Sequence, residues 1–143
     1  MGHPVVTEVK EMTDLPSPRK LRDYTFSEEN MEYLERMRLL CQEKGITFML
    51  MKSPGVYPYW YDEYDEQIRE YAAEHSLSYI NLLEVSDEMG IDYSTDTYDA
   101  GIHLNESGSV KLCRWLAPVL SEQLGLQDHR NEPETAEKYA PGN

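Results

Sequence analysis

ITFMLMK (residues 46–52) and LSYINL (residues 77–82) are two short, largely apolar runs that enclose an amphipathic stretch and decide the fold. Both are brief and contain β-branched and aromatic residues, which is typical of strands buried on both faces of a parallel sheet. Residues 62–75 between them carry Tyr64 and Ile68 at helical spacing, with carboxylates on the other faces. Strand, helix and strand in this length predict a βαβ unit with parallel strands and a right-handed crossover.

One further helix is predicted on each side of this unit. Residues 27–44 begin at the capping residue Ser27 and end before Gly45, which supplies a left-handed stop. Residues 106–124 form the last helix, and Pro118 is expected to kink or split it. Apolar positions at helical spacing are expected to face the core; they are Met31, Leu34, Met37, Leu40 and Cys41 in the first helix, and Leu112, Cys113, Leu116, Leu120 and Leu124 in the last.

The chain is predicted to hold one α/β domain, over residues 26–125, between two polar ends. Residues 1–25 contain three prolines and are expected to be irregular, although Val5-Val6-Thr7 fits a short edge strand. Residues 126–143 are expected to be a disordered tail. Because two strands do not make a stable open sheet, we expect added strands from the N-terminal segment, self-association, or a domain that lacks its front half.

The charge and the cysteines narrow the classes of function. The formal net charge of −14 disfavours nucleic-acid and membrane-surface roles, because such a field repels phosphates and anionic headgroups. No signal peptide or membrane segment is visible, so a cytoplasmic protein is expected, unless a missing N-terminal segment carried an export signal. Cys41 and Cys113 belong to no Cys-x-x-Cys pair and are expected to be reduced thiols in the core.

TDTYDAGIHLNESG (residues 95–108) is the stretch that carries chemistry. It resembles the final conserved block of SGNH/GDSL hydrolases, in which an Asp shortly precedes a His, followed by Leu-Asn, a Gly and a helix. ENMEYL (residues 29–34), Gly45 and MKSP (residues 51–54) are similar to the preceding helix and strand of one bacterial branch of that superfamily. The resemblance covers roughly residues 24–120 and implies a three-layer α/β/α sandwich with a parallel sheet, flavodoxin-like and here incomplete.

In that family a Ser attacks an ester carbonyl, a His takes its proton and an Asp orients the His. The resemblance implies that His103 is the base and Asp99 the orienting acid. Asp99 lies four residues before His103, where the family has three, so Asp96 stays open as the partner. The Gly-Asp-Ser block and the oxyanion-hole blocks are not recognisable, and the chain alone is expected to be inactive.

The implied chemistry is ester hydrolysis or acyl transfer on a small-molecule or carbohydrate ester, including carbohydrate deacetylation, with no metal or cofactor. One His with loop carboxylates is also a poor ligand set for a metal. Ser53 is the serine placed where α/β sheets bind ligands, at the carboxyl end of a strand. The loop after it contains Tyr57, Tyr59 and Trp60, which either pack locally or form a substrate wall. The alternative function is a non-catalytic binding or assembly module.

Overall fold

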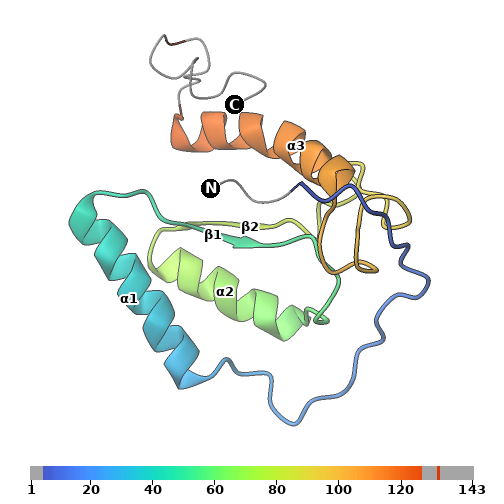
Figure 1. The fold of residues 1–143 in the computed structure, drawn as a ribbon. Coiled ribbons are helices and arrows are strands. Elements are labelled where there is room, and N and C mark those ends of the chain that lie inside the picture. Colours follow the sequence, from blue (N-terminus) through green and yellow to red (C-terminus); the bar gives the residue numbers. More distant parts are fainter. Residues whose placement is uncertain (1–4, 127–131, 133–143) are drawn as a thin grey trace.

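The computed structural model of the chain describes residues 5–126 and residue 132. Its elements, in chain order, are α1 (Glu28–Lys44), β1 (Met49–Lys52), α2 (Asp62–Glu74), β2 (Ser78–Asn81) and α3 (Glu106–Leu124). The described part is therefore a small mixed α/β fold with three helices and a two-stranded sheet. β1 and β2 are parallel, with Met49 opposite Ser78 and Lys52 opposite Asn81, which confirms the predicted βαβ pairing. Figure 1 shows α2 on one side of the strands and α3 on the other.

The helix ends follow the capping residues that the sequence predicts. The Ser27 hydroxyl accepts a hydrogen bond from the Asn30 backbone N–H at 3.2 Å, which satisfies one of the free donors of the first turn of α1. Gly45 closes α1 in the left-handed conformation at φ +64°, where a side chain would be strained. α3 runs from Glu106 to Leu124 through Pro118, which is exposed, so of the two predicted effects of this proline the helix does not show the split.

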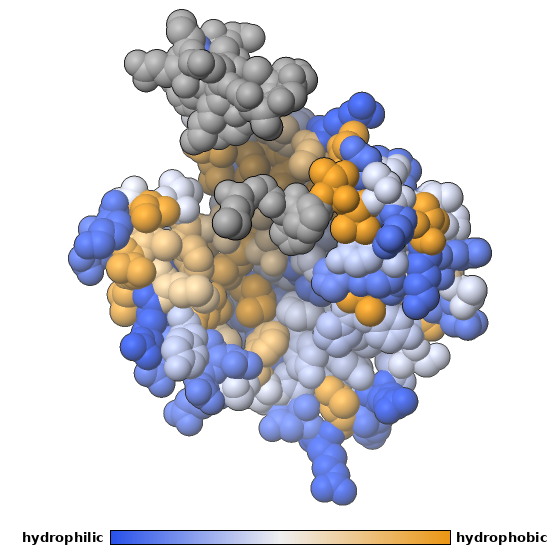
Figure 2. All heavy atoms as spheres, viewed as in Figure 1, coloured by the Kyte–Doolittle hydropathy of each residue, from blue (hydrophilic) through white to orange (hydrophobic). Residues whose placement is uncertain are grey.

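The apolar stripe of α1 does not face a core. No residue of α1 is buried, and Tyr33, Met37 and Leu40 are each roughly half exposed. Polar contacts hold the helix to α2 instead, since the Tyr71 hydroxyl donates to Glu35 at 2.8 Å. The prediction that Met37 and Leu40 point inward is therefore wrong. Figure 2 shows apolar side chains exposed over α1 and in the hollow between α1 and α3.

β1 is shorter and more open than its composition suggests. The strand begins at Met49 rather than at residue 46, and Ile46 is exposed. Leu50 is buried, but Met51, which the alternation of a strand turns to the other face, is 46% exposed. The expectation of a strand buried on both faces is therefore wrong. Leu112 and Trp115 of α3 pack instead against Leu82, Met89 and Ile91, which follow β2.

The apolar core lies where the chain leaves β2. Leu82, Met89 and Ile91 are buried together, and Leu112 and Trp115 of α3 pack against them. Cys113, one position from Leu112, is exposed, and Cys41 is only partly buried. The prediction that both thiols belong to the core is therefore wrong, and for Cys41 the reason is that α1 has no buried residue.

Residues 6–12 form an N-terminal strap along the loop that precedes α3 (Figure 1). The backbone of Lys10 donates to the Thr97 carbonyl at 2.9 Å and accepts from Ala100 at 3.2 Å, and the Glu106 N–H donates to the Val6 carbonyl at 2.8 Å. The segment is irregular as predicted, but the edge strand suggested for residues 5–7 is not formed. The strap therefore fixes the loop from outside without adding a strand to the sheet.

Apart from residues 126 and 132, the tail predicted over residues 126–143 lies outside the described residues. Within the described part, none of the helices combines the length and the apolarity that crossing a bilayer requires.

Candidate functional site

The loop before α3 is pinned at both of its ends by buried polar side chains. Asp96 is fully buried, accepts from the Asp92 N–H at 2.7 Å and pairs with Lys111 of α3 at 2.6 Å. Asn105 caps α3 by accepting from the Gly108 N–H at 3.1 Å, and its amide donates to the Thr95 carbonyl at 2.8 Å. These bonds hold the intervening residues in one conformation.

Residues 98–103 project from this support as a tight loop. Thr97 and Leu104 form an antiparallel bridge at its base, and the Tyr98 N–H donates to the His103 carbonyl at 3.3 Å. The rings of Tyr98 and His103 are stacked, with centroids 5.7 Å apart and planes 10° from parallel. The loop therefore fixes the plane of the His103 imidazole.

Asp99 and His103 form the hydrogen-bonded pair at the centre of the site. His103 Nδ1 lies 2.5 Å from Asp99 Oδ2, and the His103 backbone N–H donates to Asp99 Oδ1 at 2.7 Å. The predicted contact between His103 and a carboxylate is confirmed, and Asp99 is the partner. Asp96 is not the partner, because its carboxylate is buried away from the His103 ring and accepts at Oδ2 from Lys111 and from the Asp92 N–H.

The charge state of Asp99 sets the tautomer of His103. Burial raises the pKa of Asp99, but hydrogen bonds from the His103 ring and backbone outweigh it, so the pKa lies below its ordinary value. An ionised Asp99 at neutral pH requires a proton on Nδ1, which leaves Nε2 to accept one. Among the described residues, no side chain is hydrogen bonded to Nε2. This is the arrangement of a general base that has been oriented by a carboxylate.

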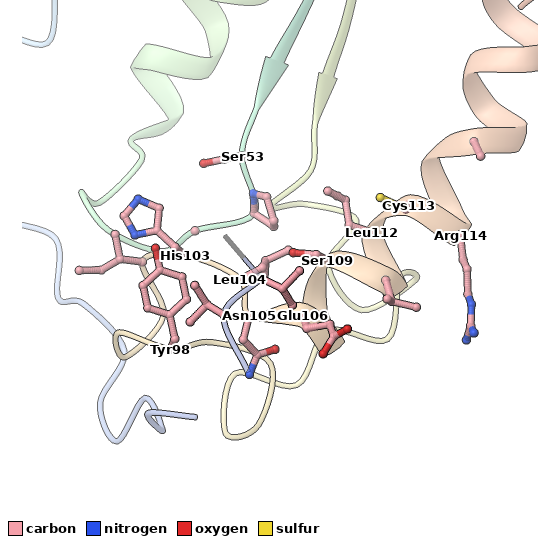
Figure 3. Close-up of a pocket in the computed structure, with 17 residues that line it drawn as sticks. Ser53, Tyr98, His103, Leu104, Asn105, Glu106, Ser109, Leu112, Cys113 and Arg114 are labelled. Carbon is pink, nitrogen blue, oxygen red and sulfur yellow. The ribbon is translucent and has the colours of Figure 1, made fainter. Parts of the chain in front are cut away.

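A cavity of about 950 Å³ opens beside His103, between the loop, the N-terminal strap and α3. Figure 3 shows Ser53 and His103 at one end of it and α3 at the other, with Ser109, Cys113 and Arg114 along the helix. Most of the remaining wall is apolar and consists of Val5, Val6, Pro54, Ile102, Leu104, Val110, Leu112 and Ala117. The size and the lining suit an apolar group of a ligand.

Ser53 lies at this cavity because the loop after β1 packs closely against the loop that carries His103, and Gly55 allows the close approach. The Val56 N–H donates to the Gly101 carbonyl at 2.8 Å. A Cβ atom at Gly55 would lie 2.2 Å from the Ile102 carbonyl oxygen, so only glycine allows this approach. The loop after β1 is thereby held against the loop that carries His103.

Gly55→Ala is expected to separate the two loops and to destabilise the fold by about 2–3 kcal/mol, because the Cβ collides with backbone that cannot rotate away. Urea unfolding measures the loss, and the NMR signals of the His103 ring should shift. Gly90→Ala is the control, since its Cβ would meet nothing and only its positive φ costs energy. Unchanged His103 signals in Gly55→Ala would contradict the prediction.

The aromatic residues of the loop after Ser53 lie elsewhere. Tyr57 is exposed and lines neither the cavity beside His103 nor the second hollow described next. Tyr59 and Trp60 line a second hollow of about 470 Å³, here called the aromatic hollow. Its other walls are Thr25, Phe26, Ser27, Asn30, Pro58, Tyr61 and Tyr64. The structure therefore brings Ser53 to His103 but not the three aromatic residues that were grouped with it from the sequence.

Several residues of the cavity beside His103 were not foreseen. Ser109 and Cys113 are four residues apart on α3 and therefore share the face that lines the cavity, a spacing that could have identified them. Val6 belongs to the strap and Val5 precedes it, and no local pattern connects either residue to His103. Their position depends on bonds between the strap and a distant part of the chain, such as the one from the Glu106 N–H to the Val6 carbonyl.

The site offers an oriented base at an apolar cavity. Ser53, Ser109 and Cys113 line it, but within residues 5–126 none of their hydroxyl or thiol groups is hydrogen bonded to His103. In the same part of the chain, no three His, Cys, Asp or Glu side chains gather closely enough to hold a metal ion. Comparisons with protein-family models, curated proteins and solved structures gave no match to this chain.

Proposed function

We propose that the chain carries the base half of an SGNH/GDSL-like ester hydrolase or acyl transferase. The observation that supports this most is the Asp99–His103 pair at a cavity that Ser53 also lines. In this proposal His103 Nε2 accepts the proton of an attacking hydroxyl, and ionised Asp99 stabilises the imidazolium that forms. The substrate is a small-molecule or carbohydrate ester. The three-layer, flavodoxin-like sandwich belongs to the proposal, and the position of α2 and α3 on opposite sides of the strands supports it.

The 143 residues contain no Gly-Asp-Ser, so they do not supply the attacking hydroxyl in a recognisable form. The test therefore reads the genomic frame upstream of the Met1 codon and expresses the longer product if that frame encodes such a block. Turnover of p-nitrophenyl butyrate by this product supports the proposal. Absence of the block, or a longer product without esterase activity, excludes it and leaves the alternative function below.

Variants of that longer product separate the Asp99–His103 pair from a coincidental esterase. His103→Ala and Asp99→Asn should each lower kcat by roughly a thousandfold to ten-thousandfold, as removal of the base or of its orienting acid does in such triads. Glu88→Gln is the control, since Glu88 is an exposed carboxylate that lines neither cavity. An unchanged kcat in His103→Ala would exclude His103 as the base.

The 143-residue chain alone is expected to hydrolyse p-nitrophenyl acetate no faster than its own His103→Ala variant. The reason is that a serine hydroxyl is a weak nucleophile until a base lies within hydrogen-bond reach, and no such contact exists in the described part. Stopped-flow absorbance measures the rate and any initial burst. A burst that disappears in Ser53→Ala would contradict the prediction and identify Ser53 as a nucleophile.

A non-catalytic assembly module is the second candidate function, and the exposed apolar stripe of α1 favours it. Tyr33, Met37 and Leu40 are spaced at one face of the helix and are each about half exposed. Clustered apolar side chains on a surface are typical of protein interfaces. In this candidate the Asp99–His103 pair only stabilises its loop.

Self-association through this stripe is expected, and its strength should rise with salt. The net charge of −14 makes two copies repel, and added ions screen that repulsion. Sedimentation velocity at several concentrations measures the effect, and Met37→Glu with Leu40→Glu should give a monomer. Leu15→Glu is the control, because Leu15 is an exposed apolar residue of the N-terminal segment. A wild-type monomer at every concentration and salt level would contradict the prediction.

A further inference from the structure

We infer that the aromatic hollow binds a neutral carbohydrate, at a site separate from the cavity beside His103. The hollow lies between the start of α1 and the loop that leads into α2. Its residues are different from those that line the larger cavity, so this inference does not depend on the proposed hydrolase.

Tyr59 is the ring of the hollow with the fewest aromatic neighbours. Among the aromatic rings of the described residues, Tyr59 contacts only Tyr61, at a centroid distance of 4.8 Å and an angle of 63°. Trp60 meets Tyr64 at 5.6 Å and 62°. Phe26 lies across Tyr64 at 5.0 Å and 30°, whereas at least one face of the Tyr59 ring is free of other aromatic rings in the described part of the chain. The face of an aromatic ring is negative, so it attracts the polarised C–H groups on the flat side of a sugar ring.

Polar groups of the hollow also lack partners within the protein. In the described part of the chain, no hydrogen bond is made by the Asn30 side-chain amide or by the hydroxyls of Tyr59 and Tyr64. An amide both donates and accepts, and so does a phenol hydroxyl. These groups therefore match the hydroxyls of a sugar, which act as donors and acceptors at once.

The charges around the hollow disfavour ionic ligands. None of the described residues that line it is an Asp, Glu, Lys, Arg or His. An aromatic hollow could bind a quaternary ammonium ion, but the Lys52 ammonium already lies 5.5 Å from the centre of the Trp60 ring and would repel it. Anions are repelled by the net charge of −14. A neutral ligand with both C–H faces and hydroxyls remains, which is the chemistry of an uncharged glycan.

The walls of the hollow are held in place before any ligand arrives. Gln67 of α2 accepts from the Phe26 N–H at 3.1 Å and donates to the Tyr24 carbonyl at 2.9 Å. The Tyr61 hydroxyl donates to the Arg19 carbonyl at 2.8 Å. These bonds fix the N-terminal segment against α2, so a ligand need not order the site as it binds.

Isothermal titration calorimetry of the whole chain with cellohexaose, xylohexaose and N-acetylchitohexaose tests the inference. Saturable binding of at least one is expected, and Tyr59→Ala and Asn30→Ala should each weaken it by about tenfold. In a Trp115→Phe background, Trp60 is the single tryptophan, and its fluorescence should change on titration. Tyr57→Ala, at an exposed residue that lines neither cavity, is the control and should bind as the parent does.

Three results would overturn the inference, provided that circular dichroism shows the variants to be folded. The first is no saturable binding of any of the three sugars at millimolar concentration. The second is equal binding by Tyr59→Ala, Asn30→Ala and the parent. The third is saturable binding of tetramethylammonium that Tyr59→Ala abolishes, which would make the hollow a cation site.

Discussion

Asp65→Ala should destabilise the fold by about 3–5 kcal/mol, because it removes the acceptor that joins α2 to the sheet. Asp65 is buried, and its Oδ1 accepts from Tyr79, Asn81 and Trp60 at 2.6, 2.8 and 3.1 Å. Its other oxygen pairs with Arg69. The substitution leaves all these donors without their partner, and two of them belong to β2. Urea unfolding followed by circular dichroism measures the loss.

The pH dependence of this effect follows from the pKa of Asp65. Burial raises that pKa, but the hydrogen bonds from Tyr79, Trp60 and Arg69 outweigh it and hold the pKa below the ordinary value of 3.8. A folded-state pKa below the unfolded one gives stability that is present above about pH 4 and lost as the pH falls through the folded value. The difference between Asp65→Ala and the wild type should therefore narrow below pH 4.

Glu66→Ala is the matched control for Asp65→Ala, since Glu66 is the next residue of α2, exposed and without a hydrogen-bond partner among the described residues. Its effect should stay within about 0.5 kcal/mol. A loss of less than about 1 kcal/mol for Asp65→Ala, or equal losses for the two variants, would show that the network does not hold the sheet to α2.

Lys111→Ala should also destabilise the fold by about 3–5 kcal/mol, because it leaves the carboxylate of Asp96 buried without a countercharge. The Asp99–His103 pair is exposed on the histidine side, where 63% of the His103 side chain meets solvent. Asp99→Ala should therefore cost no more than about 1 kcal/mol. Asp96 and Asp99 are three residues apart, yet one serves stability and the other positions the His103 ring.

Thermal and urea unfolding of Lys111→Ala and Asp99→Ala, measured side by side, check this division. The NMR signals of the His103 ring should move in Asp99→Ala and stay as in the wild type in Lys111→Ala, at temperatures where that variant is folded. A small loss in Lys111→Ala would mean that Asp96 finds another partner. A large loss in Asp99→Ala would mean that the pair is structural, which favours the assembly module.

The sequence predicted the elements and the pair at the site because both depend on residues close along the chain. Ser27 and Gly45 mark the ends of α1 through bonds within one turn. Two apolar runs that enclose one amphipathic helix form neighbouring parallel strands, because a right-handed crossover is by far the most common connection. Asp99 and His103 are four residues apart, so a tight loop brings them together. Local geometry was enough for each of these features.

The tertiary structure alone decided which surfaces are covered and which residues meet at a cavity. Helical spacing shows that α1 has an apolar stripe, but not that α1 contacts α2 through Glu35 and leaves Met37 exposed. The residues of the N-terminal strap bond through their backbone N–H and carbonyl groups. Nearly every residue has both groups, so no pattern of side chains predicts these bonds. Asp99 was chosen over Asp96 because Lys111, on another element, neutralises Asp96. Each of these features depends on contacts between segments that are far apart in the sequence, and local sequence patterns do not predict such contacts.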